Sequence, residues 1–148
     1  MSKVDDLRKL YQELEFNTPE ERELLAKVKN RQATDEEVDE LLNIITSYTD
    51  GGKKLDNIKD FENGLVSEMN EHIDDLVEME KESTDVAHLE DEEEIDKAYA
   101  DMKVRYKEIV EKAEETYDAL KEAYFQVDDF VQYNDRLYEA KENLLHLE

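Results

Sequence analysis

A heptad pattern in the C-terminal part of the chain is the feature that most constrains its fold. Alternating steps of four and three residues from Ile95 meet apolar or tyrosine side chains at twelve of fifteen positions. These fifteen positions are Ile95, Tyr99, Met102, Tyr106, Ile109, Ala113, Thr116, Leu120, Ala123, Val127, Phe130, Asn134, Leu137, Lys141 and Leu144. Such a repeat is typical of helices packed side by side as in a coiled coil. A second stripe widens the predicted buried face enough for two or more neighbouring helices, at Val110, Tyr117, Tyr124, Val131, Tyr138 and Leu145.

The composition favours the same fold class. The chain has 148 residues, of which three are glycine, one is proline and 42% are charged. A β-sandwich needs a turn signal every ~8–12 residues, and so few turn-forming residues cannot supply that. The hydrophobic content of 39% is nevertheless sufficient for a folded domain. We therefore predict an all-α protein.

Three short helices are predicted in the N-terminal part. The first runs from about Lys3 to Glu15 on the spacing of its apolar residues. Thr18 and Thr34 each precede acidic residues in the manner of helix N-caps, so they are expected to begin the second and third helices. Asp50-Gly51-Gly52 is expected to end the third, because glycine accepts the left-handed conformation found at helix ends.

Two longer helices are predicted to follow. The fourth runs from about Lys53 to Glu82, with an inward face at Leu55, Ile58, Glu62, Leu65, Met69, His72, Leu76 and Met79. Gly64 in this helix marks either a close contact or a weak point. Ser83-Thr84-Asp85 is the expected connection. The fifth helix would run from about Glu90 to Leu147, a length of roughly 85 Å, with kinks expected at Asp128-Asp129 and Asn134-Asp135.

These lengths predict an architecture of a three-short-helix base, residues 1–52, packed on a long antiparallel helical hairpin, residues 53–148. The hairpin is expected to be bundle-like or coiled-coil-like, and the whole to unfold as one cooperative domain. Because the fifth helix is nearly twice as long as the fourth, the base is expected to cover the C-terminal half of the fifth helix. The segment between the two long helices would then lie at the far end of the hairpin.

Negative charge is concentrated in that segment. The segment from Glu68 to Asp101 contains fifteen acidic residues and two lysines, which gives it a net charge of −13 out of the chain's −24. Such a density costs self-repulsion, so it is kept either for solubility or for a basic partner. Spread over two helix ends, it amounts to roughly one charge per 1.7 Å, which is similar to duplex DNA. The candidate partner-binding residues, which we call the acidic tip, are Glu71, Asp74, Asp75, Glu78, Glu82, Glu90, Asp91, Glu92, Glu93, Glu94 and Asp96.

The charge and composition also exclude several classes of partner. A nucleic acid is not expected to bind directly, because phosphate recognition needs a basic face. No apolar stretch is long enough to cross a membrane, and the negative charge opposes anionic lipid surfaces. The sequence contains no cysteine, and its charged start does not resemble a signal peptide. We therefore expect a cytoplasmic protein.

Searches for catalytic, metal and cofactor motifs do not give a convincing site. His72, His88 and His146 lack a second histidine at ligand spacing, and paired Glu-x-x-His motifs of di-iron bundles do not occur. Gly51-Gly52-Lys53-Lys54 opens a helix but lacks the spacing and the hydroxyl residue of a phosphate loop. The acidic runs do not match the calcium-loop pattern. We expect no catalytic residues, no metal and no cofactor, and hence no enzyme.

Two functional hypotheses follow from these observations. The first is a non-catalytic interaction protein whose acidic tip docks on a Lys/Arg-rich protein surface, including the case of a nucleic-acid mimic that inhibits a DNA- or RNA-handling protein. The second is a helical scaffold or assembly chaperone that forms a homodimer through the C-terminal heptad seam. In that case Asn134 and Lys141, as polar residues at seam positions, would set the register of the two chains.

Overall fold

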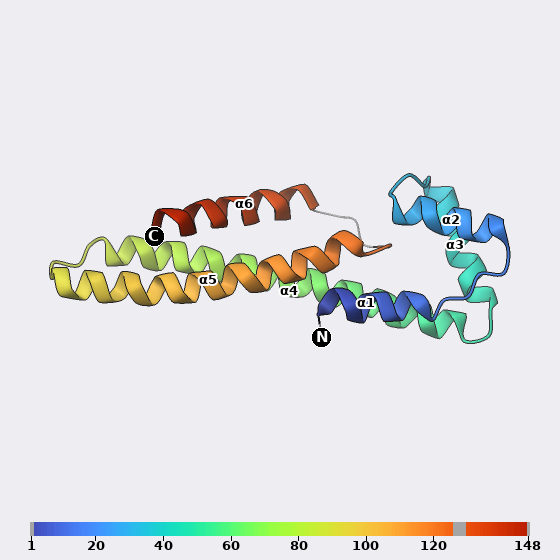
Figure 1. The fold of residues 1–148 in the computed structure, drawn as a ribbon, viewed down its shortest axis with the longest axis horizontal. Coiled ribbons are helices and arrows are strands. Elements are labelled where there is room, and N and C mark those ends of the chain that lie inside the picture. The colour runs from blue at the N-terminus through green and yellow to red at the C-terminus, as the bar shows by residue number, and fades with distance from the viewer. Residues whose placement is uncertain (1, 126–129, 148) are drawn as a thin grey trace. The chain divides into compact units, whose positions relative to one another are not determined.

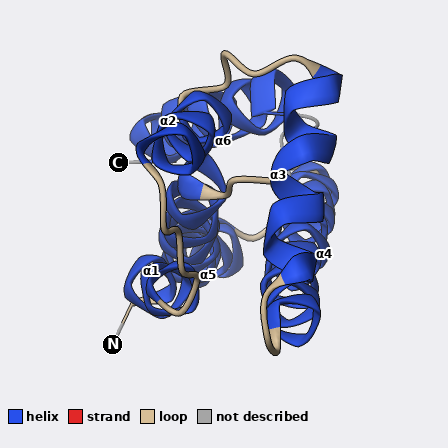
Figure 2. Cartoon of the chain, turned by 90° about the vertical axis from the view of Figure 1, so that its right-hand side faces the viewer, coloured by secondary structure: helices blue, strands red, loops and turns tan. Residues whose placement is uncertain are grey.

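The computed structural model is all-α, as predicted, and describes residues 2–125 and 130–147. Figure 2 shows only helices and loops over this part of the chain. The helices in chain order (Figure 1) are α1 (Lys3–Gln12), α2 (Pro19–Lys29), α3 (Asp35–Ser47), α4 (Gly51–Val86), α5 (Glu92–Glu122) and α6 (Phe130–Leu147). Across these residues, none of the helices combines the length and the apolar character that a membrane crossing requires.

The chain divides into two compact units. The first contains Met1–Val66 and Asp118–Asp128, and the second contains Ser67–Tyr117 and Asp129–Glu148. The long helices α4 and α5 each contribute residues to both units. The first unit holds the three short helices, the beginning of α4 and the end of α5. The second holds the rest of α4 and α5 together with α6.

The predicted N-caps of α2 and α3 are confirmed. The Thr18 hydroxyl accepts a hydrogen bond from the Glu21 amide at 3.2 Å, and Pro19 occupies the first helical turn. At Thr34 the reciprocal pair is complete, because its hydroxyl accepts from the Glu37 amide at 3.2 Å while the Glu37 carboxylate accepts from the Thr34 amide at 3.1 Å. Each pair satisfies backbone N–H groups that a helix leaves without an internal partner.

The junction between α3 and α4 differs from the prediction. Gly51 and Gly52 belong to α4 rather than ending α3, and neither has a positive φ. Asp50 instead takes the left-handed conformation, with φ of 61°. Gly51 is required for a different reason: a Cβ at this position would overlap the carbonyl oxygen of Ile45. Gly51 therefore marks a close approach of two backbone segments, and the Gly-Gly pair is not a helix stop.

The end of α4 also differs from the prediction. Ser83-Thr84-Asp85 was expected to be the connection, but α4 continues through these residues to Val86. The Thr84 hydroxyl donates a hydrogen bond to the carbonyl of Glu80 at 3.3 Å. This polar side chain therefore finds its hydrogen-bond partner within the helix. Val86 is 7% exposed and extends the apolar face by one more heptad step from Met79. The connection to α5 is formed by residues 87–91.

The predicted single C-terminal helix is wrong, because α5 ends at Glu122. The expected kink at Asp128-Asp129 lies outside the described residues, and Asn134-Asp135 lies within α6, where the helix continues. Tertiary contacts that no heptad pattern encodes compete with helix continuation at this point. The amides of Tyr124 and Phe125 donate to the Glu62 side chain, and the carbonyls of Lys121 and Ala123 accept from Arg31.

The break changes which face of α6 is buried. Tyr133, Leu137 and Ala140 are 3–4% exposed, whereas Asn134 and Lys141 lie on the exposed side of the helix. The seam predicted by continuing the α5 heptad therefore shifts by one residue except at Leu137. In α5 itself the prediction holds well, since Met102, Tyr106, Ala113, Thr116 and Leu120 are all buried. Val127 and the side chain of Phe130 lie outside the described residues.

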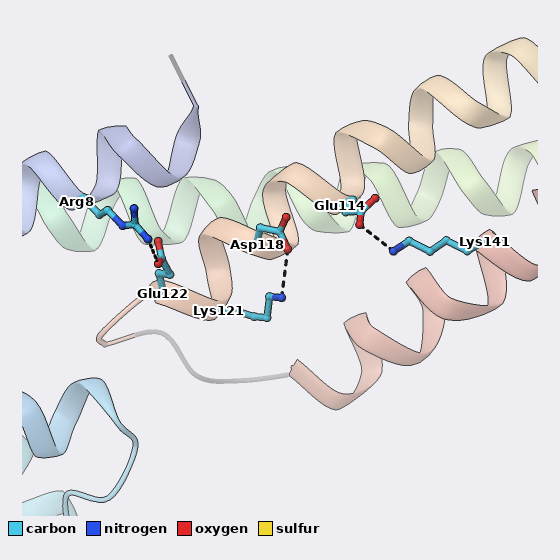
Figure 3. Close-up of polar contacts among 6 residues, drawn as sticks. All are labelled: Arg8, Glu114, Asp118, Lys121, Glu122 and Lys141. Carbon is cyan, nitrogen blue, oxygen red and sulfur yellow. Dashed lines mark hydrogen bonds and ion pairs between the residues drawn. The ribbon is translucent and has the colours of Figure 1, made fainter.

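A buried polar cluster connects α1, α4 and the end of α5 in the first unit. Glu62, although a carboxylate, is only 1% exposed. The hydroxyl of Tyr11 in α1 donates to Glu62 Oε1, and the Tyr124 amide donates to the same oxygen at 2.9 Å. The Tyr11 and Tyr124 rings stack with centroids 3.7 Å apart and planes 8° from parallel. Close by, Arg8 of α1 forms a salt bridge with Glu122 at the end of α5 (Figure 3).

Arg31 joins this cluster from the connection between α2 and α3. Its backbone is left-handed, with φ of 60°, where glycine is usual after a helix. The Arg31 amide donates to the Val28 carbonyl at 3.1 Å and the Gln32 amide to the Lys27 carbonyl at 2.9 Å, which closes α2 with a Schellman motif. Its guanidinium donates to the carbonyl of Ala123 at 2.7 Å. A positive charge at the C-terminal end of α5 is also favoured by the helix dipole.

In the second unit, polar contacts attach α6 to both long helices. Arg136 forms a salt bridge with Glu80 of α4 at 3.4 Å. Lys141 extends from α6 toward Glu114 of α5 and pairs with it at 2.9 Å (Figure 3). Tyr133 donates its hydroxyl hydrogen to Asn70 of α4 at 3.2 Å. Together with the buried face of α6, these contacts make α6 the third helix of this unit.

Candidate functional site

All eleven residues of the acidic tip lie in the second unit, on the later part of α4, the connecting residues and the first turns of α5. Ten of them are exposed, and Glu82 is half-buried. The apolar residues Met79, Val86 and Met102 are buried in the same region, so the carboxylates stand on a packed helical support. Leu89 of the connection is 40% exposed and lies next to the run from Glu90 to Glu94.

Local structure accounts for part of the acidic run. Glu92, Glu93 and Glu94 occupy the first turn of α5, where the positive end of the helix dipole favours carboxylates. Asp91 Oδ1 accepts a hydrogen bond from the Glu93 amide at 3.0 Å, which satisfies one free N–H group of the helix start. Each such contact lowers the cost of crowding the negative charges, and none of them neutralises a charge.

Few cations of the chain lie against the acidic tip. Glu82 pairs with Arg105, which also contacts Asp101 at 2.9 Å, and Glu78 lies 3.6 Å from Lys81. Within residues 2–125 and 130–147, the other nine carboxylates of the tip have no Lys, Arg or His within salt-bridge distance. Their charges are therefore available to groups from outside the chain.

The described part of the chain does not bring together three His, Cys, Asp or Glu side chains in a metal-binding arrangement. The acidic tip therefore combines high charge with dispersed carboxylates. Of the histidines, His72 is half-exposed on α4, whereas His88 and His146 are exposed. None of the three lies within the cluster around Glu62.

An open cleft of about 310 Å³ lies between the three helices of the second unit. Its walls include Met79 and Met102, and Asn143 donates to the Tyr106 hydroxyl at 3.5 Å beside it. Sequence reasoning did not identify this cleft, because its α6 wall was predicted to continue α5 as one long helix. The polar residues that line it are Glu80, Ser83, Tyr106, Asn143 and His146.

Sequence reasoning placed Glu62 on the inward face of α4 but assigned it no role. Burial is the largest influence on this carboxyl and raises its pKa, against the hydrogen bonds from Tyr11, Tyr124 and Phe125 and the charge of Arg31. The same burial, together with the negative Glu62, raises the pKa of Tyr11 well above its usual range. The sequence signal that could have identified this site was the presence of a glutamate, Glu62, at a position of the α4 heptad that is otherwise apolar. Arg31 had no comparable signal.

Comparison of the chain with protein-family models, with curated proteins and with solved structures finds no significant match.

Proposed function

We propose that this chain is a non-catalytic interaction protein that docks its acidic tip on a Lys/Arg-rich surface of another protein. The observation that carries the proposal is the set of nine exposed tip carboxylates that lack a basic partner within the described residues. Guanidinium and ammonium groups recognise carboxylates through charge-assisted hydrogen bonds, and opposite charge accelerates the encounter of the two proteins. A cytoplasmic setting is part of this proposal, as is the antiparallel, coiled-coil-like packing of the two long helices.

A DNA- or RNA-handling protein is the partner class that the charge pattern fits best. Such a protein carries a basic groove shaped for a dense row of phosphates. Carboxylates presented by two neighbouring helices at a similar linear charge density would occupy that groove and exclude the nucleic acid. Binding of this kind releases counterions from both surfaces, so its affinity falls steeply as salt rises.

Affinity capture from a lysate of the source organism tests the proposal. In the tip variant, Glu90→Gln, Asp91→Asn, Glu92→Gln, Glu93→Gln and Glu94→Gln remove five charges. In the control variant, Glu23→Gln, Asp39→Asn, Glu40→Gln, Asp56→Asn and Asp60→Asn remove five exposed charges from the first unit. A protein retained by the wild type and the control, lost with the tip variant and released by added duplex DNA is expected. Equal retention by the tip variant would contradict the proposal.

Self-association is the second candidate function. The surface that favours it lies on α6 and differs from the seam that the heptad pattern predicted. Leu137, a seam residue, is already buried within the second unit and is not available to another chain. Tyr138 and Leu145 lie seven residues apart on one side of α6 and are 65% and 64% exposed. Sedimentation equilibrium decides this alternative. A dimer that dissociates when Tyr138 and Leu145 both become serine would support it, and a monomeric wild type would exclude it.

A further inference from the structure

Glu62 is a titratable group that docking by the acidic tip does not use. Among the residues whose side chains are described, it is the only charged one that is buried. It lies in the first unit, whereas the acidic tip lies in the second. A carboxylate withdrawn from water is costly unless it is paired or hydrogen-bonded, or binds a proton.

Among the described residues, the hydrogen bonds to Glu62 are all accepted by one of its two oxygens. Oε1 accepts from the Tyr11 hydroxyl, from the Tyr124 amide at 2.9 Å and from the Phe125 amide at 3.4 Å. The Tyr124 amide also lies 2.9 Å from the Tyr11 hydroxyl oxygen. A carboxylic acid retains a carbonyl oxygen that accepts hydrogen bonds. A proton on Oε2 would therefore neutralise the group without displacing any of these donors.

The groups around Glu62 oppose one another electrostatically. The titratable side chains that face it are Tyr11 from α1, Arg31 from the connection after α2 and Tyr124 from the turn after α5. Arg31 favours the charged carboxylate, and burial favours the neutral acid more strongly. Arg8 and Glu122 pair with each other and act on Tyr124 with opposite sign.

We propose that Glu62 is a proton-binding latch, which fastens the turn at residues 123–125 to α1 and α4 more tightly when its carboxyl group is protonated. With the proton bound, the Tyr124 and Phe125 amides keep their acceptor, and the cost of a buried charge disappears. Without the proton, the same contacts hold a desolvated anion. Arg31 reaches this turn from the connection between α2 and α3, where its backbone is left-handed, and its guanidinium donates to the Ala123 carbonyl.

The sign of the pH effect follows from linkage. Because the pKa of Glu62 is raised in the folded protein, the folded state binds this proton more tightly than the unfolded state does. Its stabilising contribution is complete below the free glutamate value of ~4.3 and is lost as pH rises through the folded-state pKa. The latch is therefore tighter below the folded-state pKa of Glu62 than above it.

NMR measurements on the full chain test the latch. Two readouts are required: the titration of the Glu62 carboxyl carbon, and the exchange protection of the Tyr124 and Phe125 amides at pH 5.5 and pH 8. Glu62→Gln keeps a carbonyl acceptor and carries no charge, and Asp56→Asn removes an exposed charge from the same helix and the same unit as a control. We expect Glu62 to titrate above ~4.3 and protection to be lower at pH 8 than at pH 5.5 in the wild type and in the control.

In Glu62→Gln the protection of the two amides is expected to be the same at both pH values, after correction for intrinsic exchange. A Glu62 carboxyl that titrates at or below the free value would overturn the latch, as would a pH dependence that survives Glu62→Gln. If this variant fails to fold, the titration in the wild type decides the question alone.

Discussion

At the scale of single residues, two glycines of α4 occupy opposite steric environments. An added Cβ at Gly51 would overlap the Ile45 carbonyl, whereas at Gly64 it would meet open space on an exposed position. We predict that Gly51→Ala destabilises the protein by more than about 2 kcal/mol, since backbone must move. Gly64→Ala should instead stabilise it by up to about 1 kcal/mol, through helix propensity. Urea unfolding of both variants checks the pair, and equal effects of the two substitutions would contradict this assignment.

Arg31 combines a strained backbone with a useful side chain, and two variants separate these effects. Arg31→Ala loses the hydrogen bonds to the α5 carbonyls and keeps the left-handed strain, whereas Arg31→Gly loses the bonds and removes the strain. We predict that the free energy of unfolding of the glycine variant exceeds that of the alanine variant by about 1 kcal/mol. The glycine variant should therefore unfold at a higher urea concentration. Both should be less stable than the wild type if the guanidinium cap stabilises the turn. An alanine variant as stable as the glycine variant would argue against backbone strain.

The cluster around Glu62 shows which contacts could not be predicted from the sequence. The periodicity of α4 placed Glu62 among buried side chains, and its burial is confirmed. Its partners come from positions 11, 31 and 124–125, far from it in the chain. A local pattern cannot encode such long-range contacts. The burial of Glu62 was therefore visible in the sequence, and the geometry of its cluster was not.

At the scale of elements, local signals predicted helix starts better than helix ends. Thr18 and Thr34 mark their helices correctly because capping is decided within one turn of chain. The end of α5 depends instead on Glu62 and Arg31, which take the backbone groups that helix continuation would use. The exposure of the tip carboxylates follows from a similar local rule, since high charge on a helix keeps side chains exposed wherever the helix packs.

The new register of α6 gives an element-scale prediction. Ala140 is 3% exposed, while its neighbour Lys141 lies on the surface and pairs with Glu114. Ala140→Lys should destabilise the protein by at least about 2 kcal/mol, because it buries a charge in packed surroundings. Lys141→Ala should cost no more than about 1 kcal/mol, as is usual for an exposed salt bridge. Thermal unfolding of the two variants measures this difference. A larger destabilisation by Lys141→Ala than by Ala140→Lys would contradict the register described here and would support the uninterrupted heptad seam.

At the scale of the whole molecule, a net charge of −24 opposes the compact state. We predict that raising sodium chloride from about 20 mM to about 300 mM increases the unfolding temperature, because the shorter screening length weakens repulsion among the carboxylates. Circular dichroism at the two salt concentrations measures the shift. The tip variant, with five fewer charges, should show a smaller increase than the wild type. A wild-type unfolding temperature that falls with salt would mean that attractive ion pairs dominate.

The central claim is that the acidic tip binds a basic protein surface, and the salt dependence of a purified complex tests it most directly. Dissociation constants for the captured partner would be measured for the wild type, the tip variant and the control variant between about 50 mM and about 200 mM salt. The account predicts at least about tenfold weakening for the wild type and the control over this range, and a much shallower slope for the tip variant. Equal slopes for all three proteins, or an affinity that salt does not change, would contradict it.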